Sequence, residues 1–181
     1  MLTIVVPETE EFDPRTGTFT IYKKEVLSLE HSLVSISKWE SKWKKPFLSE
    51  EEKTPEETLD YIRCMTVSPA NVDPVVYTHL PMSAIKKINE YIADPMTATT
   101  IREDRGARRS REIITSELIY YWMVALQIPF ECQKWHLSRL MTLIRICNIK
   151  NEPEKKMSRG EIYRQNSALN AARRKMYGTK G

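Results

Sequence analysis

The sequence predicts a mainly α-helical protein, a bundle of several helices around a central helical hairpin at 114–147. A small β-hairpin or sheet is expected at the N-terminus and an amphipathic helix at the C-terminus. Three observations point to this class. Apolar residues recur every three or four positions over much of the chain, which is the period of a helix. Hydroxyl or acidic residues followed by proline mark several helix starts. Only five glycines stand against ten prolines, which suits helices separated by breaks better than a turn-rich β fold.

Composition indicates one folded domain with appended segments. The 181 residues are 41% hydrophobic, and the formal charge is +4. That mild basicity permits contact with nucleic acid but does not argue for it, because such proteins usually concentrate positive charge more strongly. The N-terminal sequence MLTIVVPETEEFD lacks the basic and apolar regions of a signal peptide. The longest apolar run covers about half of the roughly 20 residues that a membrane span needs, so we expect an intracellular protein.

Three segments are expected along the chain: a β segment at 1–30, a helical domain at 31–148, and a linker with a C-terminal helix at 149–181. In the first segment, LTIVV and TFTIY are β-branched and aromatic runs separated by an acidic loop. Val26, Leu27 and Leu29 extend the second run or pair with it. The helical domain is expected to contain a mobile basic loop at 96–112.

The first helix is predicted from a change of period after Ser32. Ile36, Trp39 and Trp43 fall on one helical stripe, and Pro46 ends the helix. Two tryptophans four residues apart usually pack against a neighbouring element. The alternative is a stacking platform for bases, which needs exposed rings beside a basic groove.

Three further short helices follow, each with a start signal. TPEE at 54–57 combines a threonine N-cap, a proline at the first helical position and a capping-box glutamate. Asp73 with Pro74 repeats the cap and proline, and Ser83 caps the next helix, which ends before Pro95.

The central hairpin is predicted between Ile114 and Cys147. Leu118–Leu126 is apolar without interruption, and a run that is apolar on every side must be buried by its own domain or by a partner. Pro129 breaks the run, and a second stripe carries Trp135, Leu137, Leu140, Ile144 and Cys147. We expect 118–126 to be core.

The C-terminal helix is predicted from a second capping box, SRGE at 158–161, and runs to about Tyr177 with Gly178 as its cap. Its apolar stripe is thin: Ile162, Leu169, Ala172 and Met176. This stripe could dock on its own body, on a neighbouring subunit or on another protein.

No catalytic, metal or cofactor site is expected. Gly106 and Gly160 stand outside any phosphate-binding motif. Cys132 and His136 are four residues apart, but a zinc site needs two more ligands and no paired spacing supplies them. The cysteines at 64, 132 and 147 are expected to be reduced and buried. The sequence therefore does not suggest an enzyme.

Two basic segments remain, the arginine-rich loop at 102–111, which includes Arg108 and Arg109, and the tail at 173–180. They are interpreted as solvated surface, as a contact for an acidic or protein partner, or as a nucleic-acid contact. Interspersed acidic residues weaken the last interpretation.

Several segments resemble tail assembly chaperones of long-tailed bacteriophages. The resemblance is carried by EHSLVSISKWESKWKKPFLS at 30–49, KTPEETLDYIRCMT at 53–66 and ITSELIYYWMVALQIPFECQKWHLSRLMTLIRICN at 114–148, with a Ser-, Asn- and Arg-rich tail at 166–181. Together these segments cover more than half of the chain.

The resemblance implies a helical, oligomeric, non-enzymatic protein of the host cytoplasm that binds and solubilises the tape measure protein and recruits tail tube subunits. It implies neither a membrane nor a nucleic acid as partner. Candidate partner contacts are Trp39, Trp43, Trp135, Arg139, Arg108, Arg109, Ile162 and Leu169. Two alternatives stay open, a structural virion component such as a head–tail connector or tail completion protein, and a small nucleic-acid-binding regulator.

Overall fold

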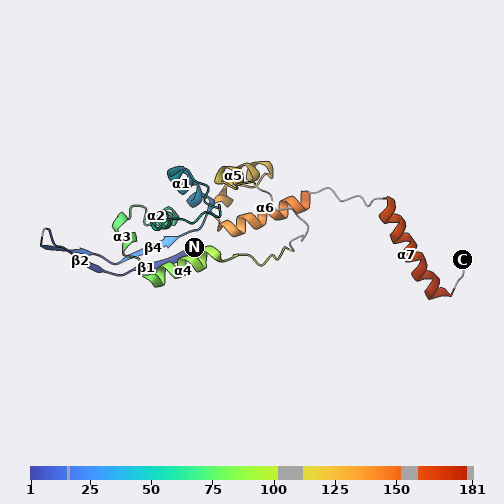
Figure 1. Ribbon diagram of the computed structural model, residues 1–181, viewed down its shortest axis with the longest axis horizontal. Helices are drawn as coiled ribbons and strands as arrows, with labels where there is room; N and C mark the ends of the chain where they lie inside the picture. The colour runs from blue at the N-terminus through green and yellow to red at the C-terminus, as the bar shows by residue number, and fades with distance from the viewer. Residues whose placement is uncertain (16, 102–111, 152–158, 179–181) are drawn as a thin grey trace. The chain divides into compact units, whose positions relative to one another are not determined.

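The computed structural model describes residues 1–15, 17–101, 112–151 and 159–178. Its contacts divide the chain into two compact units, Met1–Asn148 and Ile149–Gly181. Over the described residues the chain forms seven α-helices, one 3-10 helix and five strands (Figure 1). The predicted mainly α-helical bundle is therefore wrong. The fold is a mixture of α and β structure in which helices and a sheet share one core.

The β part is one long antiparallel hairpin with an added third strand. β1 (Leu2–Val6) pairs with β4 (Glu25–Leu29), and β2 (Thr9–Asp13) pairs with β3 (Thr18–Tyr22). Both pairs have the same register, so they form the two ends of one hairpin. β5 (Thr66–Ser68) pairs with β4, so the sheet order is β1-β4-β5. The β2–β3 end extends away from this sheet (Figure 1).

Two sequence expectations in this region need correction. The acidic segment expected to be a loop forms β2, because Phe12 lies opposite Phe19 with ring centroids 4.9 Å apart. Such aromatic cross-strand pairs stabilise a two-stranded ribbon. The third strand, β5, comes from the helical part of the sequence. Segment 1–30 is consequently tied by backbone hydrogen bonds to residues that follow the second helix.

The helices of the first unit are mostly short and begin where the sequence provides a cap. Thr54 forms a capping box with Glu57, and Ser32 forms one with Ser35. The helices are α1 (Leu33–Trp43), α2 (Pro55–Met65), α3 (Pro74–Thr78), α4 (Met82–Ala93), α5 (Ser116–Ala125) and α6 (Leu137–Asn151), with a 3-10 helix at Phe130–Lys134.

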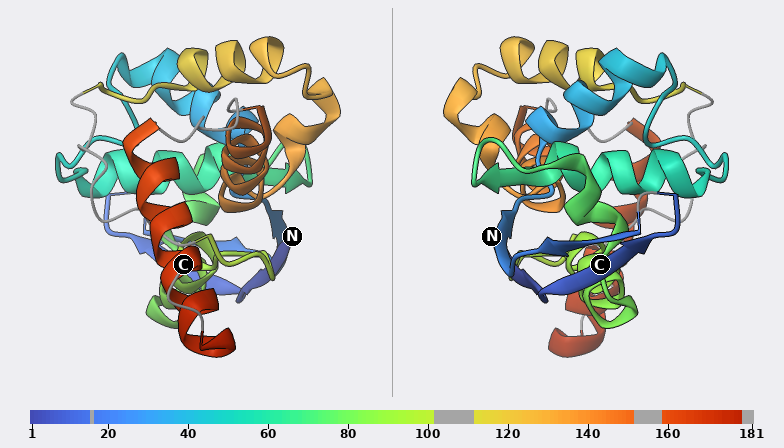
Figure 2. Two further views of the ribbon diagram at one scale, coloured as in Figure 1. Left: turned by 90° about the vertical axis from the view of Figure 1, so that its right-hand side faces the viewer. Right: turned by 90° about the vertical axis from the view of Figure 1, so that its left-hand side faces the viewer.

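The core is one cluster that joins the sheet, α1 and the other helices of this unit, and the predicted hairpin at 114–147 contributes Ile119, Met123, Leu140 and Ile144 to it. Strand alternation turns Leu27 and Leu29 inward, where neither side chain is exposed. Leu33 and Ile36 of α1 are equally buried, and they pack in one cluster with residues of α2, α4, α5 and α6. Figure 1 shows α4 beside β1, and Figure 2 shows α1 and α5 lying side by side.

The apolar run at 118–126 is only partly buried. Ile119 and Met123 are fully enclosed, whereas Tyr121 is 65% exposed and Val124 is 61% exposed. A helix packed against a core on one side buries one stripe, and here the domain supplies no layer for the opposite side. The expectation that the whole run is core is therefore wrong.

A buried polar cluster joins the sheet end, α2, α4 and the start of α6. His31 Nδ1 lies 2.5 Å from the Tyr61 hydroxyl, and the His31 and His136 ring centroids are 5.0 Å apart. His136 Nε2 donates to the Tyr91 carbonyl at 3.0 Å, and Tyr91 donates its hydroxyl to Glu30 at 2.7 Å. Burial, and secondly the nearby His136, lowers the pKa of His31 from 6.5 to about 4.

A buried carboxylate joins α1 to α5. Glu40 is 7% exposed, and its two oxygens accept from the backbone N–H groups of Phe47 and Ser116, each at 2.8 Å. Ser116 is the first residue of α5, so Glu40 provides a negative charge at a helix N-terminus that otherwise has unpaired N–H groups.

The second unit contains α7 (Arg159–Tyr177), followed by Gly178 with a φ of +63°. A glycine with positive φ is a common end for a helix, as the sequence predicts. None of the residues of α7 is buried, because a single helix has no layer within its own unit to cover its apolar side.

Candidate functional site

The two tryptophans of α1 connect that helix to α2. Trp39 is 1% exposed and donates its indole N–H to the Glu57 carbonyl at 2.9 Å. Trp43 is half-buried and donates to the Asp60 carboxylate at 2.8 Å. Trp39 is therefore a core residue and not a partner contact, and the two rings do not form an exposed stacking platform.

Trp135 and Arg139 form a pair at the start of α6. The Arg139 guanidinium lies 4.3 Å from the centroid of the Trp135 ring, within the range of a cation–π contact. Trp135 is half-buried against the core, and Arg139 is exposed. The role of this pair as a partner contact stays a prediction.

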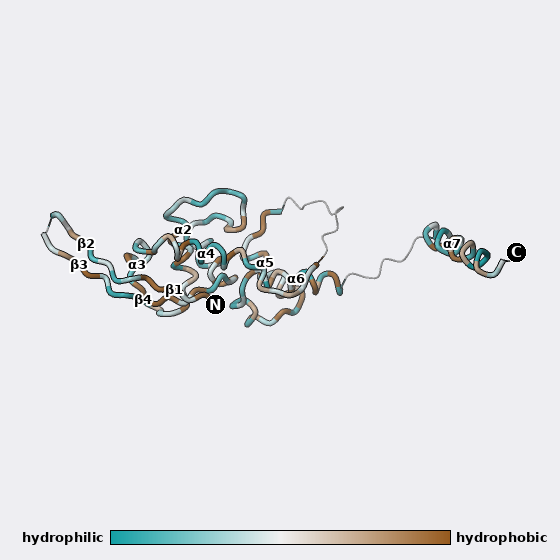
Figure 3. Tube along the Cα trace, turned by 90° about the horizontal axis from the view of Figure 1, so that it is seen from below, coloured by the Kyte–Doolittle hydropathy of each residue, from teal (hydrophilic) through white to brown (hydrophobic). Residues whose placement is uncertain are grey.

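The remaining candidates lie in two other regions. Arg108 and Arg109 fall outside the described residues. Ile162 and Leu169 lie on α7, where they are 44% and 48% exposed. Together with Met176, which is 77% exposed, they recur every seven residues and so fall on one side of the helix. Hydrophobic and hydrophilic residues both line α7 along its length (Figure 3).

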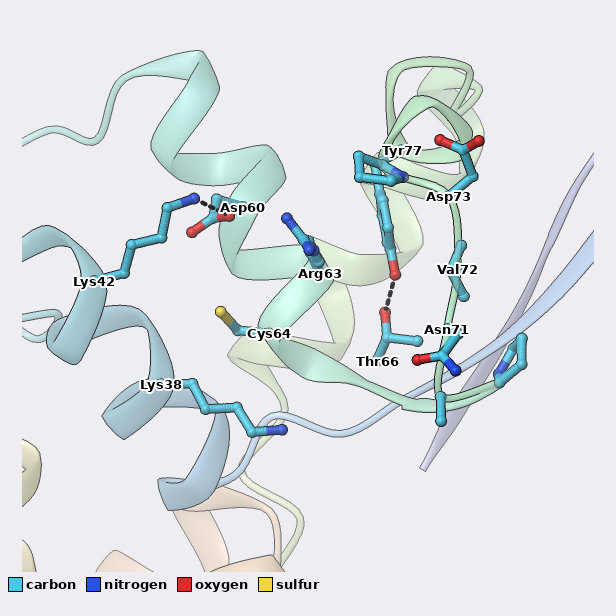
Figure 4. Close-up of a pocket in the computed structure, with 13 residues that line it drawn as sticks. Lys38, Lys42, Asp60, Arg63, Cys64, Thr66, Asn71, Val72, Asp73 and Tyr77 are labelled. Atoms are coloured by element: carbon cyan, nitrogen blue, oxygen red, sulfur yellow. Dashed lines mark hydrogen bonds and ion pairs between the residues drawn. The ribbon is translucent and has the colours of Figure 1, made fainter.

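A groove that the sequence did not indicate lies between α1, α2 and the segment that leads into α3 (Figure 4). Its volume is about 790 Å³. Three cationic side chains are arranged around Cys64 within it: Lys38 and Lys42 from α1 and Arg63 from α2. Burial, followed by Asp60, raises the pKa of the Cys64 thiol, and the three cations oppose that rise.

The rest of the groove contains several polar side chains. The Tyr77 hydroxyl donates to the Thr66 hydroxyl at 2.9 Å, which connects α3 to β5. The Asp73 carboxylate accepts from the Val75 N–H at 3.0 Å and so caps α3. Asn71 completes this wall from the loop between them. The groove therefore combines excess positive charge with both donors and acceptors.

The sequence contained part of the signal for this groove. Lys38 and Lys42 are one helical turn apart, and each directly precedes a tryptophan. Their spacing alone indicates an ordinary solvated face. The position of Arg63 beside them depends on how α2 packs on α1, which no local pattern specifies. Only the tertiary structure brings the three charges together.

Comparison of the chain with known protein families, with curated proteins and with solved structures finds no match. Among the described residues, no helix has the length and apolar character to cross a membrane. The same residues contain no group of three His, Cys, Asp or Glu side chains placed to hold a metal ion.

Proposed function

We propose that the protein is a bacteriophage tail assembly chaperone without enzymatic activity. In this role it binds and solubilises the tape measure protein in the host cytoplasm and recruits tail tube subunits as an oligomer. The sequence resemblance suggests the role, and the observation that carries the proposal is α7, a helix of 19 residues with an uncovered apolar stripe.

The stripe of α7 suits another helix as its partner. Ile162, Leu169 and Met176 repeat at heptad spacing, and residues in that pattern insert between the side chains of a facing helix. Most of the stability of a helix in a protein comes from packing of its apolar face, so packing against a partner would stabilise α7. A tape measure protein is long and helical, and it presents such faces repeatedly.

The charge of α7 favours an acidic partner helix. Its charged residues are Arg159, Arg164, Arg173, Arg174, Lys175 and Glu161, so five positive charges and one negative leave a net charge of +4. Two copies of this helix would repel each other in parallel pairing. A separate acidic helix would gain favourable charge contacts at the edges of the apolar stripe.

A second apolar surface lies on the first unit. Tyr121 and Val124 are exposed on α5, and Phe130, just beyond α5, is 54% exposed. Exposed apolar side chains that gather in one patch mark interaction sites in many proteins. A chaperone that coats a long client requires more than one contact surface, and this face provides a place for a neighbouring subunit or for the client.

Co-expression with the tape measure and tail tube proteins of the same phage, followed by a pull-down, tests the proposal. We expect the wild-type protein to keep the tape measure protein soluble and to co-purify with it. The double variant Ile162→Asp/Leu169→Asp should lose this complex. The matched variant Ser167→Asp/Ala171→Asp places the same charges on the other side of α7 and should retain it.

Two results would contradict the chaperone role. One is the absence of any complex between the wild-type protein and the tape measure protein. The other is retention of the protein in purified virions, detected by mass spectrometry, because assembly chaperones leave before the particle is complete. Retention would favour a structural virion component such as a connector or tail completion protein.

A further inference from the structure

We propose that the groove between α1, α2 and α3 binds an acidic peptide segment of a partner protein through Lys38 and Arg63, with Lys42 beside them. This site lies in the first unit and is separate from α7. It does not depend on the chaperone role, and it assigns a ligand class to a surface that the sequence resemblance leaves without one.

The first argument is that, within the part of the chain that the structure describes, the acidic side chains of the groove already have partners, whereas two of its basic side chains do not. Asp60 accepts from Lys42 at 2.6 Å, and its other oxygen accepts from an indole N–H. Asp73 is occupied in capping α3. Lys38 and Arg63 are exposed and have no ion pair among the described residues. The carboxylates are therefore already engaged, while two cations remain available to a ligand.

The second argument is that the cations act on a common space. All three side chains line the same groove as Cys64. Lys38 and Lys42 are held one helical turn apart on α1, and Arg63 approaches from α2 (Figure 4). A planar guanidinium beside two ammonium groups matches successive carboxylates, because arginine can bind a carboxylate through two hydrogen bonds.

The third argument distinguishes a peptide from a nucleic acid. A nucleic-acid backbone presents only acceptors and negative charge, which Asp60 and Asp73 would repel. A peptide also presents N–H donors, and the side-chain oxygen of Asn71 can accept a hydrogen bond from one of them. Tyr77 is 4% exposed, so the groove has no aromatic face on which a base could stack. The volume of about 790 Å³ suits a short segment better than a single small ion.

Fluorescence anisotropy with the full-length protein tests this assignment. The probe is a fluorescein-labelled peptide in which glutamate alternates with serine, and the matched probe carries glutamine in place of glutamate. We expect binding of the acidic peptide that weakens with salt, and none of the glutamine peptide. The variant Lys38→Gln/Arg63→Gln should bind roughly tenfold more weakly, since each lost charge contact removes part of the binding free energy.

The control variant Lys87→Gln/Lys134→Gln removes two exposed lysines elsewhere and should bind the acidic peptide as the wild type does. All variants are first checked by circular dichroism, and no loss of structure is expected because the replaced side chains are exposed. Equal affinity of the groove variant and the control would overturn the proposal. So would displacement of the peptide by an oligothymidine at equal or lower concentration. The α7 variants test the chaperone role separately, so either proposal can fail alone.

Discussion

Removal of the His31 imidazole should reduce the sensitivity of this protein to acid. His31 is 4% exposed, beside the Tyr61 hydroxyl and the His136 ring. Its pKa falls from 6.5 to about 4, so between these pH values the unfolded chain binds a proton that the folded protein does not. Stability must therefore decrease as the pH falls from 6.5 towards 4, and the effect is complete below pH 4.

The size of the effect follows from the two pKa values. A change of one in pKa corresponds to about 1.4 kcal/mol, so the fall from 6.5 to about 4 gives about 3 kcal/mol in full. About 2 kcal/mol of this is lost between pH 7 and pH 5, where the unfolded-state histidine becomes protonated. This is a large share of the stability of a small domain.

The assay is urea denaturation followed by circular dichroism at pH 7 and pH 5, for the wild type and His31→Gln. Between these pH values the free energy of unfolding of the variant should fall by about 2 kcal/mol less than that of the wild type. This difference does not depend on the stability of the variant at pH 7. His79→Gln removes a half-buried histidine at the end of α3 and is the control. An identical pH dependence of the wild type and His31→Gln would refute the reasoning.

Three further predictions concern stability at neutral pH. Glu40→Ala leaves two buried backbone N–H groups unpaired and should lower the free energy of unfolding by about 3 kcal/mol, while Glu52→Ala at an exposed site should change it little. Met123→Ala creates a cavity and should lower the free energy of unfolding by about 3 kcal/mol. Val124→Ala, one residue later, should change it by about 0.5 kcal/mol or less. Equal effects of the two variants would contradict the exposed face of α5. Thr54→Ala removes the cap of α2 and should lower it by about 1 kcal/mol. Urea denaturation measures all of these values.

The sequence by itself determined the elements whose signals are local. The start of α2 at Pro55 follows from TPEE, because a cap, a proline and a glutamate satisfy the first N–H groups of a helix without help from elsewhere. Strands at 2–6 and 18–22 follow from runs of β-branched and aromatic residues. The end of α7 at Gly178 follows from the backbone freedom of glycine.

Tertiary structure decided how these elements are used. β5 has three residues, which is too short for a sequence pattern to predict a strand. It forms a strand because β4 offers a free edge. Trp39 and Trp43 share a stripe, yet one is enclosed and the other only half-buried, because α2 covers them unequally. Tyr121 and Met123 belong to one apolar run, yet Tyr121 is exposed and Met123 is enclosed, because the core covers only one side of α5.

The two candidate surfaces differ in the same way. The stripe of α7 could be predicted from spacing alone, since all its residues lie on one helix. The cationic groove could not, because its charges come from helices whose relative position depends on packing across the core. Sequence patterns report what a segment can bury. Which side chains meet, and which remain for a partner, depends on the neighbours that folding supplies.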